Sequence, residues 1–252
     1  MAAGSYFPRT PRLGLRGLRR AAAVALLLAA AAVHTQEPRA APVVVVQPTQ
    51  EIALLLVAHA AVAAPGEPTS GGTLIRASRP ITGERTALPV VAHAKTPDGA
   101  EWLRVMLPGR PNGKQGWIEQ RGTRSSTTGW HVVVRTAARL VGVYREGRLV
   151  RSFSAVVGKP TTPTPHGNFF VEENVLMPPG SAGAPFALAL SARSDVLQRF
   201  EGGPGQIAIH GVLNLGGVPG TAVSHGCIRL DDHDIRWLDA RITPGVPVTI
   251  TS

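Results

Sequence analysis

Short apolar segments alternate with glycine, proline and polar residues along most of the chain, and their length is typical of β-strands. Between residues 71 and 122, four such segments follow one another at close spacing, at residues 73–77, 88–92, 102–107 and 116–118. A turn with the sequence Gly-Arg-Pro-Asn-Gly-Lys joins the last two. Several short strands separated by turn residues predict a small β-barrel in this part of the chain.

The second half of the chain has the same β-rich pattern with one helical exception. Residues 130–136 alternate and are β-branched, and Glu146-Gly147 divides residues 139–150 as the turn of a hairpin would. Further strands are predicted at residues 151–158, 168–172, 206–210 and 245–250, with loops at 160–167 and 177–205. Only residues 234–240 have helical spacing, with Asp231 as a candidate cap. The pattern therefore predicts a mostly β protein with a short helix.

Two segments have the composition of connecting chain. Residues 36–70 are rich in proline and alanine, which favours an extended tether. The apolar run 52–64 within it could form a short amphipathic helix or a first strand. The polar residues 121–129, rich in serine and threonine, predict a linker. We therefore expect a β module at residues 71–122 and a second domain at residues 129–252.

The first 35 residues have the pattern of an export signal. Five arginines precede an apolar run at residues 21–33 that ends in small alanines. This order is typical of such signals, and the run is shorter than the ~20 residues that cross a bilayer as a helix. The sequence leaves open whether residues 1–35 are cleaved or kept as a signal anchor. We expect the protein outside the cytoplasm, in the cell envelope, with membrane contact only through an uncleaved N-terminal segment.

The net charge of +10 does not point to nucleic acid. Residues 1–40 hold six arginines and one glutamate, so half of the excess belongs to the N-terminal segment. The rest has no long basic run with interleaved aromatic residues, the pattern expected of a nucleic-acid-binding surface. The remaining positive charge suits an anionic envelope polymer, or belongs to a solvated surface without a partner.

The candidate chemistry centres on Cys227, the one cysteine of the chain. It lies in the run Ser-His-Gly-Cys-Ile-Arg-Leu at residues 224–230, which also contains His225, and His210 lies seventeen residues upstream. A thiol reacts as its thiolate, and a nearby imidazole can take its proton. Gly226 permits a tight turn in which the N–H groups of Gly226 and Cys227 face a substrate carbonyl. The run therefore predicts a cysteine nucleophile.

Two other interpretations of these residues have to be weighed. A lone cysteine is usually a small buried hydrophobic residue, although an unpaired thiol in an exported protein invites a chemical explanation. His210, His225 and Cys227, with His233 or an aspartate, are also ligand types that zinc accepts, but their spacing matches no common zinc site. We expect neither a metal nor another cofactor.

Two motifs resemble the signature of the YkuD-type L,D-transpeptidases: Ile-Ala-Ile-His-Gly at residues 207–211 and Ser-His-Gly-Cys-Ile-Arg-Leu at residues 224–230. Thr-Pro-His-Gly-Asn-Phe at 164–169 and Gly-Val-Pro-Val at 245–248 resemble the family's Thr-Pro-x-Gly-x-Phe loop and its closing strand. The likeness covers roughly residues 130–251. It implies a catalytic domain built as a two-sheet β-sandwich with a short helix.

The upstream module carries a second resemblance. The segment 102–118, with its Gly116-Trp117 pair, resembles bacterial SH3-like modules, which often accompany cell-wall enzymes. That resemblance implies attachment or positioning at the wall, or a structural spacer. The expected architecture is then a β-sandwich catalytic domain preceded by a small SH3-like β-barrel.

The family resemblance implies peptide cross-linking in peptidoglycan. Cys227 would attack the carbonyl of the third residue of a stem tetrapeptide, release the terminal D-alanine and form an acyl-enzyme, which the amine of a neighbouring stem's diamino acid resolves. His210 would be the base, oriented by the Gly211 carbonyl, and His225 would shape the pocket. The N–H groups at Gly226 and Cys227 would hold the oxyanion. Carbapenems are expected as inhibitors.

Two further residues are candidates for binding the stem peptide. Arg229 could hold a substrate carboxylate through a bidentate pair, or form a structural ion pair with Asp231 or Asp232. Ser224 is expected to contact the substrate as well. The sequence assigns no binding residue to the lid region at 178–204.

Other outcomes of the same chemistry stay open. Water or a free D-amino acid could take the acyl group, and the nucleophile and base would be the same. A non-enzymatic wall-binding protein is the alternative of a different class, which the intact cysteine and histidines disfavour. Residues 212–223 lack the Thr-Asn that often follows His-Gly in relatives. The acceptor diamino acid, the oligomeric state and the role of the SH3-like module are not fixed by the sequence.

Overall fold

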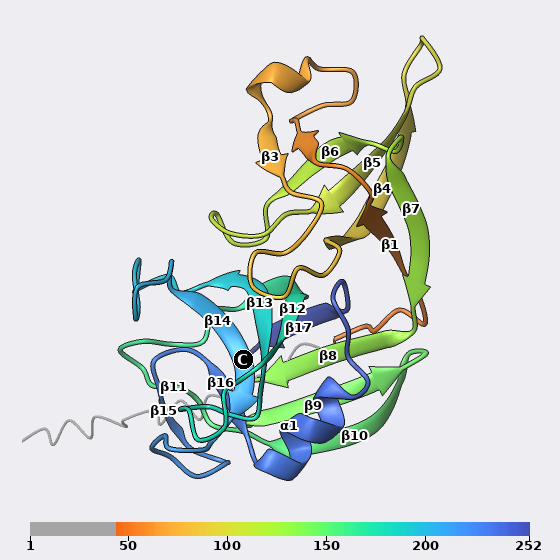
Figure 1. Cartoon of the computed structure of the whole chain (residues 1–252). Helices are drawn as coiled ribbons and strands as arrows, with labels where there is room; N and C mark the ends of the chain where they lie inside the picture. Colours follow the sequence, from red (N-terminus) through yellow and green to blue (C-terminus); the bar gives the residue numbers. More distant parts are fainter. Residues whose placement is uncertain (1–43) are drawn as a thin grey trace, which may run out of the picture. The chain divides into compact units, whose positions relative to one another are not determined.

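The computed structural model describes residues 44–252, so the predicted export signal and the first part of the tether lie outside the described residues. The described chain is mostly β, as the pattern predicts, and contains one α-helix (Figure 1). The described residues 44–252 lie within a single compact unit. Within the described part of the chain, no helix is long and apolar enough to span a membrane.

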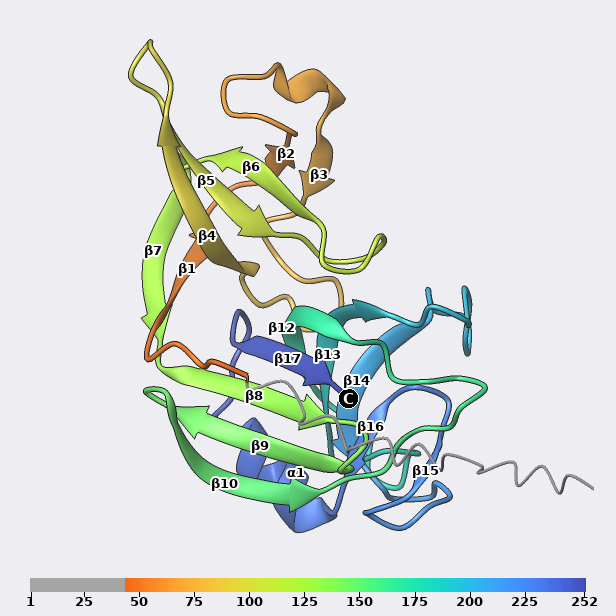
Figure 2. The same cartoon turned by 180° about the vertical axis from the view of Figure 1, so that it is seen from behind.

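Five antiparallel strands form the main sheet of the N-terminal module, a name used here for residues 50–128 (Figure 2). In the order β6-β5-β4-β1-β7 they are β6 (Gln115–Glu119), β5 (Glu101–Met106), β4 (Ala87–Lys95), β1 (Gln50–Leu55) and β7 (Thr123–Thr128). The short elements β2 (His59–Ala61), η1 (Thr69–Gly71) and β3 (Thr73–Ile75) complete the module. The predicted hairpin at 102–118 is present as β5 and β6. The likeness to SH3-like modules stays a prediction.

The five-stranded sheet includes residues that the sequence pattern predicted to be tether or linker. Of the two alternatives for the apolar run 52–64, a helix or a first strand, the strand is confirmed, because β1 lies between β4 and β7 and β2 follows it. The predicted linker 121–129 contains β7, which pairs with β1 along its whole length. Since β7 reads Thr-Arg-Ser-Ser-Thr-Thr and contains no buried residue, backbone pairing and β-branched threonines hold it, and no hydrophobic pattern reveals it.

Residues 129–252 contain a second sheet of eight strands, in the order β10-β9-β8-β17-β12-β13-β14-β16. The strand β12 (Gly167–Leu176) pairs with β17 through its first residues and with β13 through its later ones. The two halves of the sheet meet at β12, and one apolar core takes side chains from both halves and from the helix. The other strands are β8 (Trp130–Arg135), β9 (Leu140–Arg145), β10 (Arg148–Ser154), β13 (Phe186–Arg193), β14 (Gln206–Gly211), β16 (Ile228–Leu230) and β17 (Pro247–Thr251).

The predicted loop at 177–205 contains a strand. β13 lies between β12 and β14, and its residues from Leu188 onward are all buried. A strand covered on both faces shows no alternation of apolar and polar residues, so periodicity does not reveal it. The predicted helix is α1 (Asp232–Asp239), preceded by Asp231, whose side chain makes no capping hydrogen bond. Two short strands, β11 (Val157–Gly158) and β15 (Ala222–Ser224), pair in parallel.

Two successive phenylalanines of β12 join the N-terminal module to the second sheet. Phe169 packs in the core of residues 129–252, whereas Phe170, on the opposite face of the strand, packs among the apolar residues of the module. Both side chains are 1% exposed, and burial of each contributes about 1.5–3 kcal/mol. The strand β12 therefore contributes one side chain to each of the two apolar cores.

Candidate active site

Cys227 lies between β15 and β16, beside the strand that carries His210. The strands β14 and β16 are parallel neighbours, and His210 pairs with Arg229. The Cys227 Sγ lies 3.9 Å from the carbonyl oxygen of Gln206 and is close to the N–H of Ala208. Because paired residues of neighbouring strands project from the same face, the imidazole of His210 and the guanidinium of Arg229 lie side by side, and Cys227 precedes Arg229 by two residues. Among the described residues no hydrogen bond joins the thiol to the imidazole.

Buried hydroxyl groups fix the turn before the nucleophile. The Oγ of Ser224 donates to the carbonyl of Cys227 at 2.6 Å and accepts from the N–H of Gly226 at 3.1 Å. Thr162 donates to the Ser224 carbonyl at 3.2 Å, and Thr164 donates to the Gly226 carbonyl at 2.9 Å. Gly226 has a φ of +121°, which residues with a Cβ rarely adopt. The turn is therefore specified by one glycine and three hydroxyls.

This hydrogen bonding bears on two expectations. Ser224 is 0% exposed and its Oγ makes two internal hydrogen bonds, so it holds the turn, and the expected contact of Ser224 with the substrate gains no support from this geometry. The N–H of Gly226 donates to the Ser224 hydroxyl, so an oxyanion would have to compete with this bond. The N–H of Cys227 is the other candidate oxyanion donor of the predicted pair.

One backbone bond sets the protonation pattern of His210. Its Nδ1 lies 2.8 Å from the carbonyl oxygen of Gly211, and since a carbonyl only accepts, Nδ1 carries the hydrogen and Nε2 the lone pair. Burial lowers the pKa of His210 to about 4; the Gly211 carbonyl opposes this shift and the charge of Arg229 adds to it. The imidazole is therefore neutral above about pH 5 and can accept a proton at Nε2.

Two glycines bring the backbone of residues 183–184 against this imidazole. The Gly211 N–H donates to the carbonyl of Gly183 at 2.9 Å, and a Cβ at Gly211 would collide with the carbonyl oxygen of Ala184. A Cβ at Gly183 would lie 2.7 Å from Nδ1 of His210. Only glycine fits at either position without a shift of the backbone or the ring.

The thiol of Cys227 is protonated in the resting site. Burial raises its pKa, and the charge of Glu201 adds to the rise, whereas the N–H of Ala208 and the guanidinium of Arg229 oppose it. With the pKa of the thiol raised and that of His210 lowered, proton transfer between the two groups is uphill. The resting pair is a neutral thiol and a neutral imidazole.

Arg229 is a buried cation without a carboxylate partner in the described chain. It is 8% exposed, one of its terminal nitrogens donates to the carbonyl of Gly216, and its Nε makes no hydrogen bond within the described residues. Burial lowers the pKa of Arg229, which a thiolate at Cys227 would oppose, and no ion pair with Asp231 or Asp232 is formed among the described residues. Since a buried charge is costly without a partner, this guanidinium favours an anionic ligand.

His225 lies apart from these hydrogen bonds. It is exposed, and its ring centroid lies 5.4 Å from that of Phe200 at a tilt of 32°. Phe200 belongs to the segment between β13 and β14, and the next residue, Glu201, is the one whose charge acts on Cys227. His225 therefore forms part of the surface beside the nucleophile.

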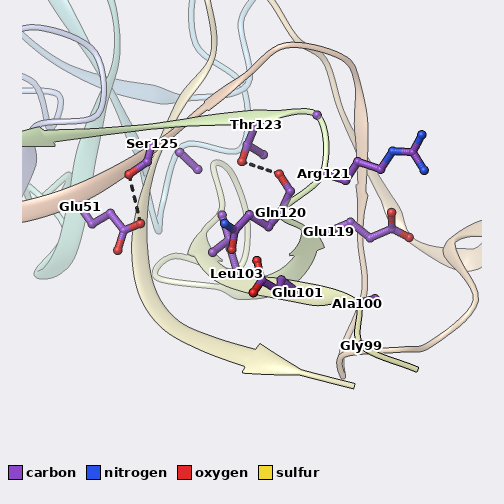
Figure 3. Close-up of a pocket in the computed structure, with 12 residues that line it drawn as sticks. Glu51, Gly99, Ala100, Glu101, Leu103, Glu119, Gln120, Arg121, Thr123 and Ser125 are labelled. Carbon is purple, nitrogen blue, oxygen red and sulfur yellow. Dashed lines mark hydrogen bonds between the residues drawn. The ribbon is translucent and has the colours of Figure 1, made fainter. Parts of the chain in front are cut away.

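A polar hollow in the N-terminal module contains none of the predicted site residues. Glu51, Glu101 and Glu119 contribute to its lining, and the Ser125 hydroxyl donates to Glu51 at 3.4 Å (Figure 3). Its lining has no cysteine and no histidine, so it is not the reactive site. Among residues 44–252, no group of three histidine, cysteine, aspartate or glutamate side chains is placed to hold a metal ion.

Comparison with known sequences shows the family to which the chain belongs. The model of the L,D-transpeptidase catalytic domain, YkuD, matches residues 129–250. YkuD of Bacillus licheniformis is 32% identical over 125 residues, which cover 50% of this chain and 67% of that protein. The chain belongs to the YkuD family of L,D-transpeptidases. L,D-transpeptidase 1 of Mycobacterium tuberculosis is 29% identical over 130 residues, 47% of this chain and 49% of that protein.

Solved structures of L,D-transpeptidases are more distant. L,D-transpeptidase 3 of Mycobacterium tuberculosis, in complex with a faropenem-derived adduct, matches 66% of this chain and 91% of its own, with a TM-score of 0.42 and 19% identity. The imipenem complex of LdtMt1 matches the same shares, with a TM-score of 0.41 and 20% identity. The family assignment rests on the sequence matches alone.

The L,D-transpeptidase site includes residues that sequence reasoning missed. Thr162 was not singled out, and Thr164 was noted only as part of the Thr-Pro loop. Their spacing was a usable signal, since two hydroxyls two residues apart can face one side of an extended segment. Gly183 and Glu201 gave no signal, because their contacts depend on backbone that is distant in the sequence.

Proposed function

We propose that this protein is a peptidoglycan L,D-transpeptidase that works through an acyl-enzyme on Cys227. The observation that carries the proposal is the thiol beside the strand of His210, whose Nδ1 is bound to the Gly211 carbonyl and whose Nε2 is left to accept a proton. Membership of the family supports the reaction class. The export signal predicted at residues 1–35 supports action in the cell envelope, where stem peptides are found.

In the first half of the reaction, Cys227 displaces D-alanine from a stem tetrapeptide. The thiol proton moves to Nε2 of His210 while sulfur attacks the carbonyl carbon of the third residue. The tetrahedral intermediate collapses by breaking the bond to D-alanine, whose amine takes the proton from the imidazolium. The products are free D-alanine and a thioester. Because the resting pair is uncharged, charge develops only as the nucleophile attacks.

In the second half, the side-chain amine of a diamino acid on a neighbouring stem attacks the thioester. Nε2 of His210 takes a proton from the attacking amine, the carbon–sulfur bond breaks, and the thiolate regains its proton from the imidazolium. The product is an amide bond between two third-position residues. The same steps with water as attacker give a tripeptide instead.

Two groups stabilise the charges of substrate and intermediate in this proposal. The N–H of Cys227 donates to the oxyanion, an interaction typically worth ~3 kcal/mol. The guanidinium of Arg229 binds a carboxylate of the stem peptide, which its burial and its lack of a carboxylate partner in the described chain support. Both groups act before and during the attack by sulfur.

Product analysis with a tetrapeptide stem tests the proposal. The full chain is incubated with the peptide, and mass spectrometry follows D-alanine, tripeptide and cross-linked dimer. We expect D-alanine and dimer from the wild type and neither from Cys227→Ala. Tripeptide without dimer would make the protein a hydrolase with the same nucleophile. No D-alanine from a wild-type chain with a titrated free thiol would count against the acyl-enzyme.

A further inference from the structure

We propose that the N-terminal module is a working part of the transpeptidase site, in which Arg110 positions residues 194–205 beside the reactive turn. We call residues 194–205 the active-site loop. The inference rests on the proposed function, because it assigns a positioning residue to the same reaction. It gives the module a role inside the site in place of a separate role in wall attachment.

One guanidinium joins both ends of the active-site loop. A terminal nitrogen of Arg110, Nη2, donates to the carbonyl oxygens of Ser194 at 2.7 Å and Leu197 at 3.2 Å. The other, Nη1, donates to the carbonyl oxygen of Pro204 at 2.9 Å. Arginine presents its N–H donors in a rigid planar fork, which the ammonium of lysine does not reproduce. Arg110, between β5 and β6, therefore spans a loop that belongs to the other sheet.

A second residue of the same turn secures the point where the loop begins. The Nδ2 of Asn112 donates to the carbonyl of Arg193 at 2.7 Å, and its Oδ1 accepts from the N–H of Arg193 at 2.8 Å. The same Nδ2 donates to the Asp195 carboxylate at 3.0 Å, and the Gly109 N–H donates to the carbonyl of Ser191 at 3.2 Å. The β5–β6 turn thus continues the hydrogen bonding of β13 up to the loop.

The active-site loop has little else to hold it. No residue from 195 to 204 is buried, so apolar packing contributes little to its position. Its internal hydrogen bonds join Ser194 N–H to the Gly205 carbonyl at 2.8 Å, and Phe200 to Gly203 in both directions at 3.1 and 2.9 Å. The Ser194 hydroxyl also accepts from the N–H groups of Val196 at 3.3 Å and Leu197 at 3.0 Å. These bonds shape the loop, whereas the hydrogen bonds that attach it to the rest of the described chain come from Arg110 and Asn112.

The loop brings two side chains to the site. Phe200 packs against His225, with ring centroids 5.4 Å apart, and Glu201 is close enough for its charge to act on the thiol of Cys227. A displaced loop would change the surface that the stem peptide meets beside the nucleophile. The Cys227–His210 pair itself is held by β14, β16 and the buried hydroxyls. Loss of Arg110 should therefore weaken substrate binding more than the chemical step.

A role in folding alone makes different predictions. The module and the second sheet are already joined by the buried ring of Phe170, which packs among the apolar residues of the module. If Arg110 positions the loop, its removal should therefore lower the melting temperature by only a few degrees. If Arg110 acted in folding alone, its removal would lower the melting temperature and leave KM unchanged.

The test compares the full chain with Arg110→Ala, Arg110→Lys, Phe200→Ala and the double variant Arg110→Ala/Phe200→Ala. Arg104→Ala is the matched control, because Arg104 is an exposed arginine of β5 whose side chain makes no hydrogen bond within residues 44–252. KM and kcat are measured for a tetrapeptide donor, and amide hydrogen exchange is measured at residues 195–204.

We expect Arg110→Ala to raise KM about tenfold or more, with a smaller change in kcat and faster exchange at residues 195–204. Arg110→Lys should recover only a minor part, and Arg104→Ala should match the wild type. If Phe200 is the group that the loop delivers, Phe200→Ala and the double variant should have nearly the same KM, because both lose one contact.

An unchanged KM in Arg110→Ala, together with unchanged exchange at residues 195–204, would overturn the inference. Fully additive effects of Arg110→Ala and Phe200→Ala would overturn the route through Phe200. If Arg110→Ala fails to fold, as judged by near-UV circular dichroism, the lysine variant carries the comparison. If the wild-type chain releases no D-alanine, the proposed function is wrong. Hydrogen exchange at residues 195–204 in Arg110→Ala then still shows whether Arg110 holds the loop.

Discussion

Burial acts on the two reacting groups in the same sense, because it keeps both of them uncharged. It raises the pKa of Cys227 and lowers that of His210 to about 4. A thiol that stays protonated is a poor target for oxidants and adventitious electrophiles, since the thiolate is the reactive form. This suits the single unpaired cysteine of a protein proposed to act in the cell envelope. Activation must then come with the substrate.

The raised pKa of Cys227 predicts slow alkylation at neutral pH. For a thiol, a pKa above the usual value means that the thiolate fraction is small near pH 7 and grows about tenfold per pH unit until the pH passes the pKa. We expect the rate of iodoacetamide alkylation of Cys227 to be still far below its maximum at pH 8.5, where a free cysteine peptide has reached about half of its maximal rate. The alkylation rates of Cys227 and of the peptide are measured by quenching the reactions at set times and determining the alkylated fraction by intact-mass spectrometry.

An alkylation rate of Cys227 that levels off at a lower pH than that of the peptide would contradict a raised pKa. It would show a thiolate stabilised in the resting site, with an ion pair between Cys227 and His210 in place of the neutral pair. The His210→Ala variant separates the two cases, because only an ion pair would make the low plateau depend on the imidazole.

At the scale of elements, the sequence predicted what local patterns encode. The hairpin at Glu146-Gly147, the hairpin β5–β6 and the helix α1 follow from turn residues and periodicity, and the His210 and Cys227 motifs from their residue types. The strands β7 and β13 escaped prediction for opposite reasons. β7 contains no buried residue and depends on its pairing with β1, whereas β13 is buried on both faces and has no alternation.

The same limit applies within the site. The residue types in Ser-His-Gly-Cys pointed to a reactive turn, but the direction of the Ser224 hydroxyl is a property of the folded turn. Contacts such as Arg110 to Pro204 join residues far apart in the chain, and no single-sequence pattern encodes them. Long-range hydrogen bonds are therefore the part of the site that only the structure supplies.

The close approach of β14 to residues 183–184 predicts that Gly211→Ala damages the site. The new methyl group would collide with the Ala184 carbonyl and push that segment away from His210. We expect a loss of about 1–3 kcal/mol in stability and a larger fractional loss of transpeptidation. Thermal melts and D-alanine release measure the two effects.

Gly71→Ala is the matched control, because a Cβ at Gly71, in η1, meets no atom within 4 Å. It should melt and react as the wild type does. Equal behaviour of the Gly211 and Gly71 variants would show that the backbone at residues 183–184 adjusts freely, and the proposed fixing of the imidazole by this contact would be wrong.

At the scale of the whole molecule, the N-terminal module and the second sheet act as one unit. Phe170 joins their cores, and the β5–β6 turn reaches the loop beside the nucleophile through Arg110 and Asn112. The family match covers residues 129–250 only, yet the described contacts place part of the site's support outside that range. The reactive centre is therefore expected to need the module for its full activity.

Acylation of Cys227 by a β-lactam can be read from the intact mass of the full chain after incubation with imipenem, beside Cys227→Ala and His210→Ala. A β-lactam that acylates the nucleophile stays attached and reports the first half of the reaction. We expect a stoichiometric adduct in the wild type, none in Cys227→Ala and slower formation in His210→Ala. A wild-type chain with a titrated free thiol and no adduct, or an adduct that persists in Cys227→Ala, would contradict the proposed acyl-enzyme on Cys227.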